Sequence, residues 1–137
     1  MKKSIKITFW ALVVTFVLMV INFFIPALKG SEAFLIPFII FSLLGLILLF
    51  LILKQKVKGK IKKFLLLTGI SASGIFISIF LHNVFYALAV ITSHIIFLNY
   101  LMEGLHVAFF ILGLIICPLG FLIGVFGTIV LFRRFLV

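Results

Sequence analysis

Two histidines and a glutamate are the residues of this sequence best suited to chemistry. Glu103 and His106 are three residues apart, a spacing that places both side chains on one face of a helix, as metal sites between helices require. His82 precedes them and could supply a third ligand for zinc or iron. The alternative is that Glu103 caps a helix and His106 sits at the membrane surface. No resident cofactor is expected.

Small and polar residues form a stripe that ends on the same histidine. They recur at spacings of three and four, which places them on one side of a helix. Lipid is a poor environment for them, so the stripe predicts a position inside the protein, with Ser78 as the nearest partner of His82. The stripe either lines a pathway for a small solute or ion, or its hydroxyls bond back to their own helix. Its members are Ser71, Gly74, Ser78, His82 and Asn83, and a second small face holds Gly69, Ala72 and Ser73.

The last apolar segment carries a stripe of small residues at spacings of four, three, four and three. Gly120 and Gly124 form a small-x-x-x-small motif, which lets two membrane helices approach closely. The contact is either within the chain or a seam between copies. Pro118 is expected to kink this helix and to free a carbonyl near Leu114, and Phe121, off the stripe, is expected to tolerate leucine. The stripe consists of Gly113, Cys117, Gly120, Gly124 and Gly127.

Composition identifies the class of protein that must position these residues. Of 137 residues, 66% are hydrophobic and only 10% are charged, which excludes a soluble domain. The net charge of +10 comes from residues at the ends of apolar spans and does not indicate nucleic-acid binding. No glycine-rich phosphate loop, serine nucleophile with its base and acid, or mid-span carboxylate is visible. The single Cys117 excludes a disulfide within the chain.

The apolar intervals predict a single transmembrane domain, residues 1–137, with four spans. Pro37 complicates the second span, for which an early start near Ser31 and Glu32 with a kink at the proline is expected. Residues 95–102 could form a short helix on the membrane surface, and a five-span alternative divides 64–102 at His82. The predicted spans are 5–28, 32–53, 62–91 and 106–132, with an outer loop at 92–105.

Basic residues predict the orientation of these spans. With four spans, 11 of the 12 Lys and Arg residues fall on one side and only Lys29 on the other. The positive-inside rule then places both termini and the loop 54–63 in the cytoplasm, at the plasma membrane. This loop is expected to attract anionic lipid headgroups. Its lysines are Lys54, Lys56, Lys58, Lys60, Lys62 and Lys63.

Two segments carry a resemblance. They read KKFLLLTGISASGIFISIFLHN at 62–83 and FFILGLIICPLGFLIGVFGTIVLF at 109–132. Together they resemble a group of small prokaryotic four-span membrane proteins that are usually described as hypothetical. The resemblance covers the second half of the chain, implies a loop between His82-Asn83 and the last span, and brings no activity with it.

The expected fold is therefore an all-α integral membrane four-helix bundle with both termini in the cytoplasm. The expected function is a non-enzymatic structural, accessory or oligomer-forming module whose partners are the bilayer and, in one alternative, further copies of the chain. A solute or ion pathway along the polar stripe is a second alternative. A metal or ligand site at the outer His and Glu residues is the third.

Overall fold

The structure, a computed structural model, describes residues 3–26 and 34–134 and is all-α there. Four helical segments in these ranges are long and apolar enough to cross a membrane. The predicted all-α, multi-pass membrane class is thus confirmed. The proposed cap at Ser31 and Glu32 and the isolated cation Lys29 lie outside the described residues.

The first two helices are bounded by prolines. α1 (Lys3–Phe23) ends three residues before Pro26. α2 (Ile36–Lys54) has Pro37 in its first turn, where a proline is tolerated because the first amides of a helix have no partner within it. Leu35 lies outside the helix, so the expected earlier start with a kink at Pro37 is wrong for the described residues.

A short connection joins α2 to α3 (Lys60–Ile91). It is shorter than the predicted loop 54–63, because lysines extend helix ends readily. Gly59 has a φ of +79°, a backbone conformation that glycine adopts without strain, and it ends the connection. Lys54 is the last residue of α2, Lys56 and Lys58 lie in the connection, and Lys60, Lys62 and Lys63 begin α3.

The last span is longer than predicted. It begins with α4 (Ile96–Ile111), continues through one π-helical turn, η3 (Leu112–Ile116), and ends with α5 (Cys117–Arg134). The predicted outer loop 92–105 is therefore reduced to four residues, because nothing between 96 and 105 interrupts a helix. Residues 96–102 are part of the long span and do not form a separate surface helix, and Ile95 lies in the turn before it.

The turn between α3 and α4 satisfies much of its own hydrogen bonding. The Thr92 hydroxyl donates to the Leu88 carbonyl at 2.8 Å, and the Ile95 amide donates to the Thr92 carbonyl at 2.9 Å. The Asn99 side-chain amide donates to the Ala89 carbonyl, also at 2.8 Å, and so ties the start of α4 to the end of α3. The turn is thus short, and it is held by hydrogen bonds within it and to the adjacent helix ends.

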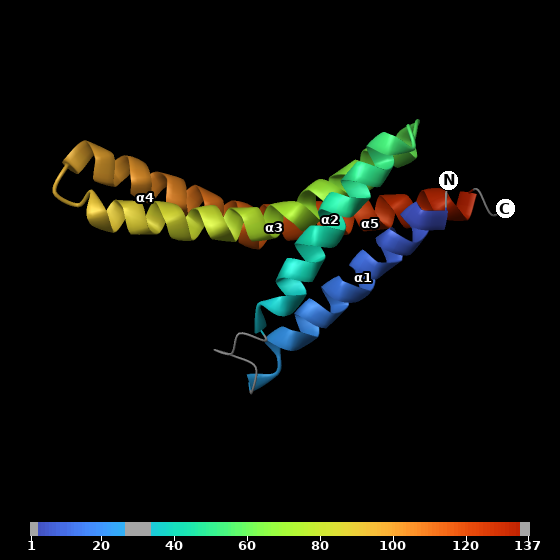
Figure 1. The fold of residues 1–137 in the computed structure, drawn as a ribbon, viewed down its shortest axis with the longest axis horizontal. Helices are drawn as coiled ribbons and strands as arrows, with labels where there is room; N and C mark the ends of the chain where they lie inside the picture. The colour runs from blue at the N-terminus through green and yellow to red at the C-terminus, as the bar shows by residue number, and fades with distance from the viewer. Residues whose placement is uncertain (1–2, 27–33, 135–137) are drawn as a thin grey trace.

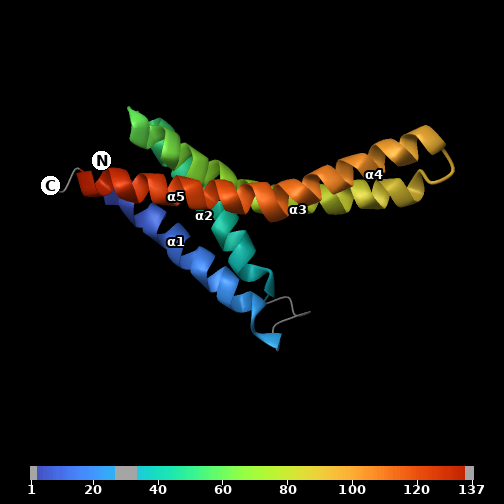
Figure 2. The ribbon, with the colours of Figure 1, turned by 180° about the vertical axis from the view of Figure 1, so that it is seen from behind.

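α3 lies at the centre of the fold and packs against α2, α4 and α5. It forms a long antiparallel hairpin with α4 and α5, and α1 and α2 lie across one half of this hairpin (Figures 1 and 2). The other half projects as two helices, which we name the arm (residues 79–111). Ala89 is the only buried apolar residue of the arm, whereas the core elsewhere joins α1, α2, α3 and α5.

The helices differ in length, and the longest exceeds the thickness of the hydrocarbon core. α1 and α2, with 21 and 19 residues, rise about 30 Å, which matches the hydrocarbon core. α3, with 32 residues, rises about 48 Å. Because most residues of the arm are apolar, the hairpin must incline strongly if the whole of it is to remain within lipid.

Candidate functional site

The small face of α3 at Gly69, Ala72 and Ser73 lies against α2. A Cβ atom added to Gly45 of α2 would lie 2.8 Å from the Ser73 amide nitrogen and 2.9 Å from the Gly69 carbonyl oxygen. The Ser42 hydroxyl donates to the Ser73 carbonyl at 3.3 Å across this contact. Only a glycine at position 45 allows so close an approach of the two backbones.

The polar stripe of α3 faces the small-residue stripe of the last span. Ser71 and Ser78 are 5% and 6% exposed, and Thr68 on the same side is fully buried. The two stripes run antiparallel in one register over about four turns, and we name this contact the α3/α5 seam. Along the seam Phe64 meets Gly127, Thr68 meets Gly124, Ser71 meets Gly120, Gly74 meets Cys117 and Ser78 meets Gly113.

Hydroxyl groups at these helix contacts are bonded locally. Thr68 donates to the Phe64 carbonyl at 2.9 Å, and Ser73 donates to the Gly69 carbonyl at 2.9 Å, each one turn back along α3. Thr68 and Ser73 thus use their hydroxyl groups within α3, whereas the hydroxyl of Thr128 on α5 is buried without a hydrogen-bond partner among the described residues.

The π-helical turn precedes Pro118, where a kink was expected. Proline has no amide to donate one turn back, so the carbonyl of Leu114 loses its helical partner. The backbone widens instead of breaking, and the Cys117 amide donates to the Leu112 carbonyl. Gly113, inside this turn, still contacts Ser78, so the wider turn keeps the seam in register.

The structure brings His82 and His106 together in the arm. Their ring centroids are 5.1 Å apart, and His82 Nδ1 lies 2.8 Å from the His106 carbonyl oxygen. A carbonyl only accepts, so Nδ1 of His82 carries the proton and Nε2 is left free in the neutral ring. The expected partner Ser78 is thus replaced by the backbone of α4.

Aromatic rings enclose this histidine pair. Phe110 lies 5.3 Å from the His82 ring, and Tyr86 lies 5.5 Å from the His106 ring. Nδ1 of His106 is buried without a hydrogen-bond partner. The pair is therefore a semi-enclosed polar spot within an apolar arm.

The predicted metal triad is not assembled. Within residues 3–26 and 34–134, no three His, Cys, Asp or Glu side chains lie close enough to hold a metal ion. Glu103 is exposed and His106 lies against α3, although both are on α4. Asn83 is also exposed and donates to the Ile79 carbonyl of its own helix at 3.0 Å, so it takes no part in the interior.

Replacing His82 by phenylalanine isolates its hydrogen bond, because the ring contacts with Phe110 and His106 are kept. We expect a loss of about 1 kcal/mol in the free energy of unfolding in detergent, the usual net worth of one such bond. Asn83→Leu is the neighbouring control and should change stability by less than half as much. An equal effect of the two substitutions would show that the His82 bond does not stabilise the arm.

An aromatic cluster is the feature that the sequence analysis missed. Phe16 of α1 and Phe41 of α2 lie 4.8 and 4.9 Å from Phe121 of α5, measured between ring centroids. That leucine at Phe121 does less harm than leucine at the glycines of the stripe stays a prediction, although the Phe121 side chain is only 1% exposed. The Phe121 ring points away from the seam. It packs toward α1 and α2 and does not face lipid. The three phenylalanines lie on separate spans, so no local sequence pattern indicates that they pack together.

Taken together, these contacts define a multi-pass α-helical membrane protein of four packed spans, built on the hairpin of α3 with α4 and α5. Comparison of the chain with protein-family models, curated proteins and solved structures gives no match. The resemblance to small prokaryotic four-span proteins therefore remains a prediction from the two quoted segments.

Proposed function

We propose that this chain is a non-enzymatic membrane module with a structural or accessory role. The observation that supports the proposal is the burial of the polar stripe of α3. Ser71 and Ser78 are buried against Gly120 and Gly113, whereas a pathway along the stripe would need them to face water. The histidine pair, the other candidate for chemistry, lacks a third ligand among the described residues.

Flux through reconstituted vesicles tests this proposal against the pathway alternative. The purified chain in vesicles of neutral and anionic phospholipid should give potassium and proton leakage equal to that of protein-free vesicles. Gramicidin added to the same vesicles serves as the positive control. Flux above the protein-free rate that disappears in Ser71→Val and Ser78→Val would overturn the proposal in favour of a pathway.

The proposed orientation has both termini and the α2–α3 connection in the cytoplasm. Its support is the distribution of basic residues, together with the position of the start of α1, the end of α5 and this connection toward one end of the molecule (Figure 1). The side-chain amide of Gln55 donates to the Ser4 hydroxyl at 2.8 Å, which joins the connection to the start of α1. The proposed location is the plasma membrane, and anionic lipid headgroups are the proposed partners of the lysines.

A cysteine at Lys58 tests this orientation. Lys58 is exposed in the connection, and Cys117, the only natural cysteine, is buried. In intact cells Lys58→Cys should resist an impermeant maleimide and should react fully once the membrane is permeabilised. Labelling from outside at the rate seen after permeabilisation would reverse the topology.

A further inference from the structure

A shallow, open groove, lined by side chains of α1 alone, runs along the exposed face of this helix, on the side opposite to its packing face. Its volume is about 620 Å³, and most of this space is open to the surroundings. Ile5, Phe9 and Leu12 on the other side of the helix are fully buried, so α1 turns the groove away from the rest of the chain. Its lining consists of Lys3, Lys6, Ile7, Trp10, Ala11 and Val14, with Thr15 at the far end.

The groove is cationic at one end and apolar along the rest. Lys3 and Lys6 are one turn apart in the first turns of α1, where unpaired backbone amides and the helix dipole also favour an anion. The Thr15 hydroxyl donates to the Ala11 carbonyl at 2.8 Å, which leaves its methyl group to the groove. Beyond the two lysines the groove therefore offers apolar surface.

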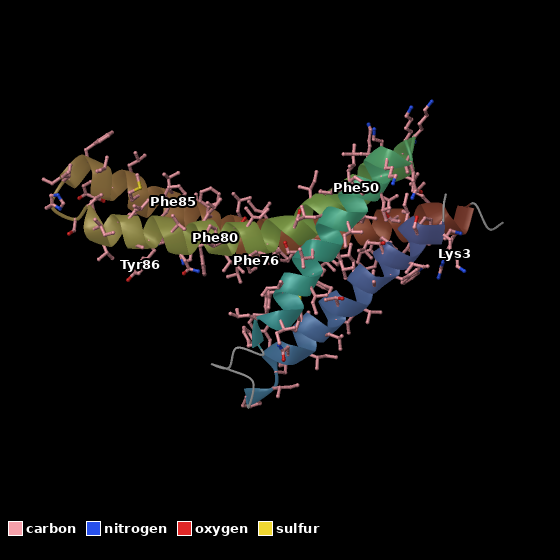
Figure 3. The ribbon with its side chains drawn as sticks, in the orientation of Figure 1. Lys3, Phe50, Phe76, Phe80, Phe85 and Tyr86 are labelled. Carbon is pink, nitrogen blue, oxygen red and sulfur yellow. The ribbon has the colours of Figure 1, made fainter. Side chains whose placement is uncertain are left out.

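Trp10 lies between the two ends. Its ring meets Phe9 edge to face at a centroid distance of 5.5 Å, which limits the orientation of the indole, and the residue remains 49% exposed. Indole rings favour the headgroup level of a bilayer, so the lysines above it are at the depth of lipid phosphates. Figure 3 shows Lys3 at the end of α1 beside the end of α5, far from the arm.

We propose that this groove binds one anionic phospholipid, with its phosphate at Lys3 and Lys6 and the upper part of an acyl chain along Trp10, Ala11 and Val14. Charge complementarity selects the occupant. Within the described residues the only side-chain carboxylate is Glu103, in the arm, so neither lysine has a carboxylate counter-ion in that part of the chain. A phospholipid supplies both the negative charge and the apolar chain that the groove requires.

Trp10 is the only tryptophan of the chain, so its fluorescence reports on this groove alone. The full chain is reconstituted in phosphatidylcholine bilayers in which a fixed fraction of the lipid is brominated phosphatidylglycerol or, separately, brominated phosphatidylcholine. From the quenching we expect the anionic lipid to be enriched beside Trp10 by about fivefold, well within what two surface lysines allow. Equal quenching by the two lipids would overturn the proposal.

Paired substitutions separate a site from general surface attraction. Lys3→Gln with Lys6→Gln should reduce the enrichment to less than twofold, whereas Lys58→Gln with Lys60→Gln, which removes the same charge, should leave it near fivefold. Equal losses in the two variants would mean non-specific attraction and no groove site. Excess inorganic phosphate should act no more strongly than chloride at the same ionic strength. Specific displacement by phosphate would make the groove a site for the free anion and would overturn the lipid assignment.

Discussion

Gly124→Leu should disrupt the α3/α5 seam and lower the free energy of unfolding in detergent by about 3 kcal/mol or more. A Cβ atom at this position would lie 2.8 Å from the Thr68 amide nitrogen and 3.0 Å from the Phe64 carbonyl oxygen. Both are backbone atoms of α3 and cannot move aside as a side chain can. Overpacking of this kind usually costs about 1–3 kcal/mol, and a leucine adds three more carbons to the clash.

Gly104→Leu is the matched control, because the same substitution is made at a helical glycine with nothing within 4 Å of an added Cβ. It should change the free energy of unfolding by less than about 0.5 kcal/mol. Gly120→Leu should fall between the two, since its nearest neighbour is the Ser71 hydroxyl, which can rotate. Equal losses at Gly124 and Gly104 would remove the seam as the organising contact of the fold.

Phe121→Ala should cost about 3–5 kcal/mol, the range for truncating a buried phenylalanine. Its ring contacts Phe16 and Phe41, so truncation opens a cavity where α1, α2 and α5 meet. We expect α1 and α2 to loosen from the hairpin while α3 and α5 stay paired. Unfolding measured in detergent micelles, together with proteolysis of the connection between α1 and α2, should detect both effects.

Phe126→Ala makes the same truncation on the same helix. Phe126 is 65% exposed, so its ring lies against lipid or detergent and its loss leaves no internal cavity. Its cost should stay below about 1 kcal/mol. If Phe121→Ala is as mild as Phe126→Ala, the three-ring cluster does not hold α1 and α2 in place.

Local patterns in the sequence predict the class of the protein and the faces through which its helices pack. Apolar runs of about 20 residues predict spans because a backbone in lipid must satisfy its own hydrogen bonds. The spacing of small residues on α3 and on the last span locates the surfaces where backbones come together. Which helix covers which surface depends on long-range packing, and only the structure shows that Gly45 lies against Ser73 and Gly124 against Thr68.

The remaining features depended on contacts between distant segments. The aromatic cluster joins Phe16, Phe41 and Phe121, and nothing in the neighbourhood of any one of them distinguishes it from the other phenylalanines. His82 was expected to bond within its own helix, but the hairpin brings a carbonyl of α4 nearer. The start of the last span was misjudged because Glu103 and His106 suggested a boundary, although one carboxylate on an exposed helical face does not end a helix.

The closed turn between α3 and α4 has a consequence for biogenesis. In the proposed topology this turn must be carried across the hydrophobic layer when the protein is inserted, whereas the lysine-rich connection must stay behind. Residues 92–95 contain no Asp, Glu, Lys or Arg, and hydrogen bonds from Thr92, Ile95 and Asn99 already satisfy carbonyls at the tip. Translocating charged groups is what makes such a passage expensive. The hairpin can therefore enter the membrane as one preformed unit, with its tip leading.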